Sequence, residues 1–171
     1  MPVKAARPPD PLRWFGLPIA ISIVATILLA LPLRVFGFGL PEPIFPMVAV
    51  FAWALVRPAF LAPFLVLLLG LFLDLFWGGP LGFWGLAMLT AYAAVLWTRP
   101  IIIGQPFLVV WVWYAGAVGV AMLMGFVVAE IRAGSMPSLF SIGWQFLATT
   151  LLYPLCHELM DRFGDGDTRL R

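Results

Sequence analysis

This sequence has few charged residues and a single cysteine. Charged side chains make up 11% of the 171 residues and hydrophobic ones 63%, whereas soluble domains average about 25% charged and roughly 45–50% apolar. A water-soluble fold of this length could not bury so much apolar surface. The lone Cys156 excludes an intrachain disulfide and a cysteine-based metal site. The net charge of +2, spread over scattered residues, argues against a nucleic-acid-binding surface.

Long uncharged runs fill most of the chain. An ionised side chain at mid-bilayer costs on the order of 3 kcal/mol, and a membrane-crossing helix needs roughly 20 apolar residues. With prolines and glycines marking the connections, the runs predict spans at 14–33, 43–56, 58–77, 80–98, 106–129 and 138–157. The first run is longer than a signal-peptide core and no convincing cleavage site follows it, so we expect a retained helix. The predicted fold is an all-α integral membrane protein, a six-transmembrane-helix bundle forming one membrane domain over residues 1–171.

The run at 43–56 is short for a span. Its 14 uncharged residues would form a helix of only about 21 Å, so it is a short span, a re-entrant piece or half of a broken helix. Counting it as a span leaves only Arg34 and Arg132 outside the cytoplasm. The eight other basic residues then lie inside: Lys4, Arg7, Arg13, Arg57, Arg99, Arg162, Arg169 and Arg171.

This distribution follows the positive-inside rule. Treating 43–73 as one kinked helix would instead leave four basic residues inside and five outside, with Arg57 in the membrane. We therefore expect six spans, with short cytoplasmic tails at both termini.

Asp74 is the only acidic residue between Glu42 and Glu130. Gly70 and Gly78 lie four residues before and after it, so the acid shares a helix face with two residues that permit close backbone approach. One interpretation is an interfacial acid that faces water or caps the outer turn. The other is a buried polar contact with another helix or with a partner protein.

Arg57 precedes Pro58, and Trp53 lies one turn earlier on the same face. This arrangement favours anchoring at the inner membrane interface. The alternative is docking of a cytoplasmic partner.

Small residues recur every four positions in the fifth span, at Ala117, Ala121, Gly125 and Ala129. Such a stripe lets membrane helices pack closely, and we favour packing within the molecule over dimerisation. His157 and Asp161 have the spacing of a metal pair but lack a third ligand, so we expect no metal site. No catalytic or cofactor-binding motif occurs, and the spans are poor in the polar groups that a transported polar substrate would need.

Three short motifs carry a resemblance to a known family. They are Trp53-x-x-x-Arg57-Pro58, then Gly70-Leu71-x-x-Asp74-Leu75, then Gly78-x-Pro80-Leu81-Gly82. In this order the chain resembles the rod shape-determining MreD family, which also matches in length and span number over almost the whole chain. Residues 1–40 and 135–171 match in hydropathy alone.

The resemblance implies a non-enzymatic scaffold without cofactors in the bacterial inner membrane. It implies work with MreC as the direct partner, within an elongation complex that contains MreB, RodA and a penicillin-binding transpeptidase, and contact with membrane lipid. Arg57 would then face cytoplasmic partners, and the turn from Asp74 to Gly82 would face MreC or a neighbouring transmembrane helix. The family's bundle is similar to the S-components of energy-coupling-factor transporters, so the alternative is a substrate-binding subunit of a vitamin transporter, which would need a pocket with several polar groups.

Overall fold

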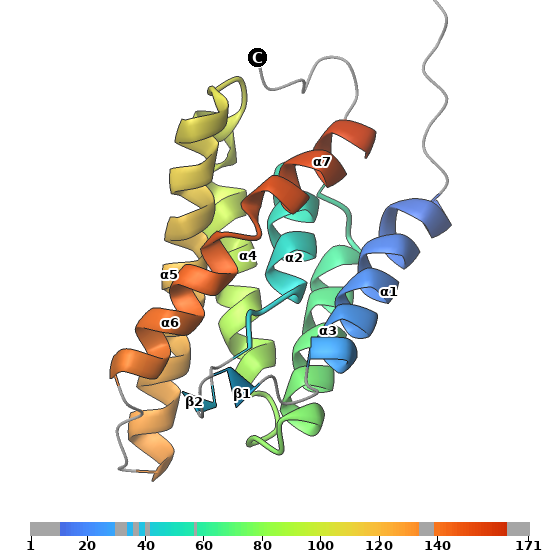
Figure 1. Ribbon diagram of the computed structural model, residues 1–171. Helices are drawn as coiled ribbons and strands as arrows, with labels where there is room; N and C mark the ends of the chain where they lie inside the picture. Colours follow the sequence, from blue (N-terminus) through green and yellow to red (C-terminus); the bar gives the residue numbers. More distant parts are fainter. Residues whose placement is uncertain are drawn as a thin grey trace, which may run out of the picture.

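The computed structural model describes residues 11–29, 34–35, 38–39, 42–56, 58–133 and 139–163, and helices dominate them (Figure 1). The elements are α1 (Pro11–Leu29), β1 (Arg34–Val35), β2 (Phe38–Gly39), α2 (Pro46–Leu55), α3 (Ala62–Phe76), α4 (Phe83–Ile102), α5 (Phe107–Ala133), α6 (Leu139–Thr150) and α7 (Tyr153–Phe163). β1 and β2 pair antiparallel, Arg34 with Gly39 and Val35 with Phe38. The predicted helical bundle is confirmed, and within the described ranges this small hairpin is the only strand pairing.

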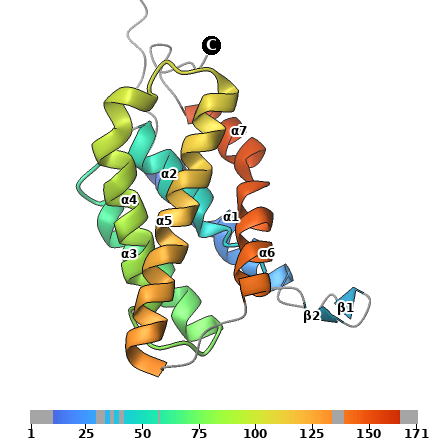
Figure 2. The ribbon, with the colours of Figure 1, turned by 90° about the vertical axis from the view of Figure 1, so that its left-hand side faces the viewer.

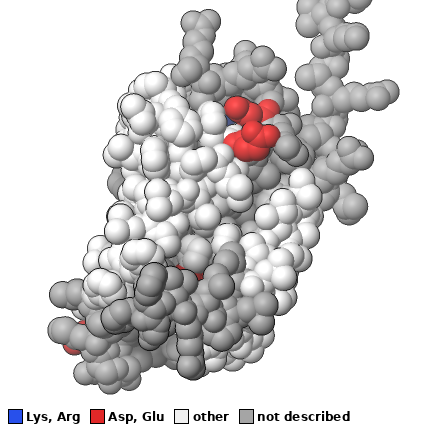
Figure 3. All heavy atoms as spheres, in the orientation of Figure 1, with Lys and Arg blue, Asp and Glu red and all other residues white. Residues whose placement is uncertain are grey.

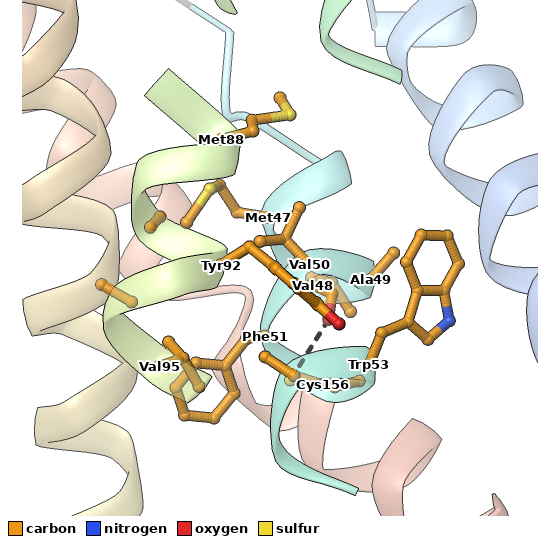
Figure 4. Packing of buried hydrophobic residues seen from close by; sticks show 14 of the residues in the cluster. Met47, Val48, Ala49, Val50, Phe51, Trp53, Met88, Tyr92, Val95 and Cys156 are labelled. Atoms are coloured by element: carbon orange, nitrogen blue, oxygen red, sulfur yellow. Dashed lines mark hydrogen bonds between the residues drawn. The ribbon is translucent and has the colours of Figure 1, made fainter. Parts of the chain in front are cut away.

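Helix α2 lies at the centre of the bundle (Figure 2). All of its residues from Pro46 to Leu55 are buried, because α1, α3, α4, α5 and α7 pack around it. Figure 4 shows Met88 and Tyr92 of α4 beside α2. On α7, the Cys156 thiol donates to the Val48 carbonyl oxygen at 3.6 Å. The core is therefore built around one short helix that contains no charged side chain.

The segment predicted as the second span, 43–56, contains a ten-residue helix with a non-helical approach. At 1.5 Å per residue α2 is about 15 Å long, half of a bilayer core about 30 Å thick. The helix begins at Pro46, whose fixed φ and missing N–H suit a first turn. Residues 42–45 precede it as non-helical chain and add at most about 13 Å. The segment is thus a short helix preceded by non-helical chain.

The segment predicted as the sixth helix, 138–157, is divided into α6 and α7. Leu151 and Leu152 form a turn between the two helices. Pro154 explains the break, because proline has no N–H for the carbonyl four residues earlier and its ring clashes with that carbonyl. Hydropathy did not reveal the break, since Pro154 lies within an apolar run.

Large apolar side chains cover the outside of the bundle. Exposed examples from successive helices are Ile21, Leu68, Trp97, Val112 and Leu147. The exposed charged residues whose side chains are described are few: Glu130 and Asp161 lie near helix ends, and Glu158 lies in the middle of α7. Figure 3 shows acidic atoms gathered at one place beside a broad surface that is mostly uncharged. Two helices, α4 and residues Phe107–Ile131 of α5, are long and apolar enough to cross a membrane by length and composition.

The bundle has two ends that hold different parts of the chain (Figure 1). At the terminal end α1 begins, α7 ends and α4 connects to α5; at the hairpin end lie β1, β2 and the α3–α4 connection. The basic residues within described elements follow this division: Arg13, Arg99 and Arg162 at the terminal end, and Arg34 and Arg132 at the hairpin end. Lys4, Arg7, Arg57, Arg169 and Arg171 lie outside the described residues.

Candidate functional site

The α3–α4 connection is organised by Asp74, which is fully buried. Its carboxylate accepts hydrogen bonds from the Gly82 N–H at 2.7 Å and from the Trp84 N–H at 2.8 Å. Gly82 is the N-cap of α4 and has no side chain to cap with, so Asp74 supplies the acceptor that an N-cap side chain normally provides. A carboxylate is also favoured at the positive end of the α4 dipole.

Two glycines shape the same connection. Gly78 has φ +65°, and the Gly79 N–H donates to the Asp74 carbonyl oxygen at 2.9 Å, which is the six-to-one bond of a Schellman motif at the end of α3. Gly82 also has a positive φ, +88°. The Asp74 carbonyl oxygen thus caps the C-terminus of α3, and the Asp74 carboxylate caps the N-terminus of α4.

Glycines also set the distance between α3 and α4. A Cβ placed on Gly70 would clash with the backbone of Gly85 and Trp84. The two helices therefore touch through their main chains, as small residues permit in membrane bundles. Gly70, Asp74, Gly78, Gly82 and Gly85 together form the α3–α4 turn site.

Two prolines within the apolar segments leave carbonyl oxygens without their helical donors, and tryptophans supply replacements. Pro18 in α1 cannot donate to the Trp14 carbonyl, which instead accepts from Trp53 Nε1 at 3.2 Å. Pro154 likewise cannot donate to the Thr150 carbonyl, which accepts from Trp111 Nε1 at 3.0 Å. A buried carbonyl left without a donor costs about 1–3 kcal/mol, so each indole N–H removes such a cost.

Polar side chains hold both ends of the α2 segment. At the end of α2, Arg99 of α4 donates through Nε to the Leu55 carbonyl at 2.8 Å and through Nη2 to the Val56 carbonyl at 3.3 Å. These carbonyls have no donor within the helix, and a cation is favoured at a helix C-terminus.

The non-helical approach to α2 is held by α6. Gln145 Nε2 donates to the Glu42 carbonyl at 3.1 Å, and the Ile44 N–H donates to Thr149 Oγ1 at 3.0 Å. Trp77 Nε1 donates to the Glu42 carboxylate at 3.3 Å. Buried irregular backbone needs protein groups that satisfy its N–H and C=O groups in this way.

Three buried polar atoms on α6 and α7 have no hydrogen-bond partner among the described residues. They are Thr150 Oγ1, Tyr153 Oη and His157 Nδ1. His157 Nε2 lies 3.5 Å from Asp161 Oδ2, but the part of the chain that the structure describes contains no group of three metal-ligating side chains.

The described cavities are mainly apolar. One of about 230 Å³ lies between α1, α2 and α7, with Ser22 and Glu158 as its polar residues. Another of about 210 Å³ lies between α4, α5 and α6, with Gln145 and Trp84. A third of about 330 Å³ opens beside Leu81 at the hairpin end. These surroundings suit apolar groups better than a polar substrate.

No protein-family model, curated protein or solved structure matches this chain. The resemblance to the MreD family therefore stays a prediction.

The motif residues do not form one site. Trp53 is fully buried against α1, so it is not the interfacial anchor that the sequence suggested, and Arg57 lies outside the described residues. Pro58 is exposed before α3, at the terminal end. The remaining motif residues gather at the hairpin end around Asp74, where Gly78 and Pro80 are exposed.

The small-residue stripe of α5 lies on the inner side of that helix. Ala117 and Ala121 are buried, and a Cβ on Gly125 would come within 3.1 Å of the Phe83 ring of α4. Ala129 lines the cavity between α4, α5 and α6. The missing side chain at Gly125 thus leaves room for the Phe83 ring of the same molecule.

Sequence reasoning missed Gly85, Arg99, Trp111 and the Glu42–Gln145 contact. Only one signal could have helped: a proline within an apolar helix predicts a freed carbonyl four residues earlier. That signal identifies the acceptor but leaves the donor open.

Proposed function

We propose that this protein crosses the bacterial inner membrane six times, with both termini in the cytoplasm. The observation that carries the proposal is the outer surface, where apolar side chains are exposed on successive helices and the exposed charges among the described side chains are limited to Glu130, Glu158 and Asp161. Soluble monomeric proteins rarely expose so continuous an apolar surface to water. The second crossing would combine residues 42–45 with α2, and the sixth would combine α6 with α7.

The proposed orientation is supported by the basic residues. Arg13, Arg99 and Arg162 share the terminal end, whereas Arg34 and Arg132 share the hairpin end. With the five other basic residues assigned as the sequence predicts, the terminal end carries the excess that the positive-inside rule associates with the cytoplasm.

We further propose that the protein is a non-enzymatic scaffold of the rod elongation complex, as its resemblance to the MreD family implies. MreC is the proposed direct partner, with MreB, RodA and the penicillin-binding transpeptidase in the same complex. The internal use of polar groups supports a scaffold: Asp74, Arg99, Gln145 and Trp53 all bind main-chain atoms of this chain. These groups hold helices in place and leave an apolar outer face for contact.

Asp74 itself is an internal residue, so its substitution would disturb the fold as well as any partner. Leu81, next to Pro80, is a better probe because it is exposed on the same connection. We expect Leu81→Asp to reduce MreC recovery while membrane insertion is kept. Leu68→Asn, on the exposed face of α3, is a control for a general effect of added polarity.

The test is a pull-down of the tagged full chain in mild detergent, with mass spectrometry of the co-purifying proteins. Recovery of MreC or the elongation synthase supports the scaffold. Recovery of paired ATPase subunits with a membrane coupling subunit would instead support the vitamin-transporter alternative.

A further inference from the structure

A carboxylate and two indole rings meet at the hairpin end of the bundle. Glu42, in the non-helical approach to α2, is partly buried and accepts a hydrogen bond from Trp77 Nε1 at 3.3 Å. Trp77 directly follows α3, and its ring contacts that of Trp84 in the first turn of α4, with ring centroids 5.3 Å apart and planes at 65°. Three separate segments thus bring together Glu42, Trp77 and Trp84, which we call the Glu42 cluster.

The carboxylate of Glu42 has no basic partner among the described side chains. The basic side chains that the structure describes are Arg99 and His157. Both are engaged elsewhere, Arg99 at the C-terminus of α2 and His157 beside Asp161. A charge that is partly removed from water needs an opposite charge or hydrogen bonds. The single indole N–H from Trp77 leaves most acceptor positions of the carboxylate unused.

The aromatic neighbours of Glu42 decide which kind of cation fits. Calcium takes about six to eight oxygen ligands, whereas the cluster offers one carboxylate beside two rings, and the described part of the chain contains no group of three metal-ligating side chains. An ammonium group instead binds over an indole face, within about 6 Å of the ring centroid. Because the Trp77 ring is hydrogen-bonded to the carboxylate, a cation over that ring is also close to the negative charge.

Trp84 connects the cluster to a cavity. It is one of the lining residues of the cavity of about 210 Å³ between α4, α5 and α6. Gln145 lines the same cavity and donates to the Glu42 carbonyl at 3.1 Å. The other lining residues are apolar, Phe83 and Phe126 among them. Carbon groups attached to an ammonium can therefore be accommodated beside the carboxylate.

We propose that the Glu42 cluster binds an organic ammonium group, with the Glu42 carboxylate as its counter-charge and the rings of Trp77 and Trp84 as its walls. The same chemistry has two sources, the ethanolamine headgroup of a phospholipid and a soluble amine. Only the first source rests on the membrane location proposed above, because that location puts the hairpin end at the outer membrane interface.

A titration of the full chain in maltoside detergent, which carries no ammonium group, tests the proposal. The probes are ethanolamine, short-chain phosphatidylethanolamine and short-chain phosphatidylglycerol, with binding measured by calorimetry. We expect phosphatidylethanolamine to bind about ten-fold more tightly than phosphatidylglycerol, because a hydrogen-bonded charge pair contributes about that factor.

A matched pair of variants tests the carboxylate. Glu42→Gln removes the charge but keeps a side-chain oxygen that can accept from Trp77 and the main-chain carbonyl that accepts from Gln145, so the fold should be kept. We expect it to weaken phosphatidylethanolamine binding about ten-fold. Glu130→Gln makes the same change at an exposed acid near the end of α5 and should leave the affinity unchanged.

A second pair tests the aromatic wall. Trp84→Leu keeps the main-chain N–H that binds Asp74 and removes the ring, and we expect binding to weaken several-fold. Trp97→Leu changes a tryptophan that is 87% exposed at the terminal end and should have no effect on binding.

The outcomes separate the sources from each other and from the membrane location. Binding of phosphatidylethanolamine without binding of ethanolamine assigns the site to the lipid headgroup, and equal binding of the two assigns it to soluble amines. Equal affinity for the two lipids together with no binding of ethanolamine overturns the ammonium site, as does an equal effect of Glu42→Gln and Glu130→Gln. Recovery of the chain in the soluble fraction of cells overturns the membrane location and the lipid source.

Discussion

Two tryptophans in this molecule act as hydrogen-bond donors to helices that contain proline. In water, a carbonyl freed by proline is hydrated at little cost, but in hydrocarbon it needs a protein donor. The indole is suited to this, because it is mostly apolar and carries one N–H. Trp53 and Trp111 come from α2 and α5, so each bond also ties two helices together.

The link between Pro18 and the hydrogen bond from Trp53 can be tested by mutation. Trp53→Phe leaves the Trp14 carbonyl unsatisfied, and we expect a loss of about 1–3 kcal/mol. In a Pro18→Ala background the new N–H can bond to Trp14, so the same substitution should cost about 1 kcal/mol less. The measurement is a double-mutant cycle of unfolding in mild detergent. Equal costs in both backgrounds would show that Trp53 contributes only packing.

Tyr153 and Tyr114 form a natural comparison, since both are fully buried. The Tyr114 hydroxyl donates to the Thr149 carbonyl at 3.3 Å, whereas the Tyr153 hydroxyl has no partner among the described residues. We expect Tyr153→Phe to be neutral or stabilising, because it removes a desolvated group, and Tyr114→Phe to cost about 1 kcal/mol. Thermal unfolding of the two variants side by side checks this; a larger loss for Tyr153→Phe would contradict it.

At the scale of elements, the α3–α4 pair is fixed by main-chain contact. We expect Gly70→Ala to push the helices apart and to cost about 1–3 kcal/mol or more, because the new methyl meets backbone that cannot yield. Gly116→Ala in α5 is the control, since nothing lies within 4 Å of its added Cβ, and alanine there should gain about 0.5–1 kcal/mol.

Unfolding in detergent measures both glycine variants. A similar effect of the two substitutions would mean that α3 and α4 are not in contact at Gly70.

The sequence was informative about long helices and much less so about broken ones. Charge spacing predicted α3, α4 and α5 closely, because arginine and aspartate lie where those helices end. It did not predict the break within 138–157, because a proline in an apolar run changes hydrogen bonding without changing hydropathy, and it left three interpretations open for 43–56. Asp74 stood out as an isolated acid, but its partners Gly82 and Trp84 bind through backbone N–H groups, which every sequence contains.

For the whole molecule, the proposed topology predicts which connections face each side. After replacement of Cys156 by alanine, Gln105→Cys in the α4–α5 connection should react with a thiol reagent only from the cytoplasm. Leu81→Cys in the α3–α4 connection should react only from outside. Labelling of intact and permeabilised cells measures this. Reaction of both sites from the same side would mean that the chain does not cross the membrane once between them, which would contradict the proposed bundle.

The residues that hydrogen-bond to the non-helical segment before α2 lie far along the chain. Glu42 and Ile44 rely on Gln145 and Thr149, which follow them by 103 and 105 residues. During synthesis, α2 therefore leaves the ribosome long before the side chains that satisfy its approach exist. A nascent chain that stops before α6 would therefore lack the side chains that satisfy the backbone of Glu42 and Ile44.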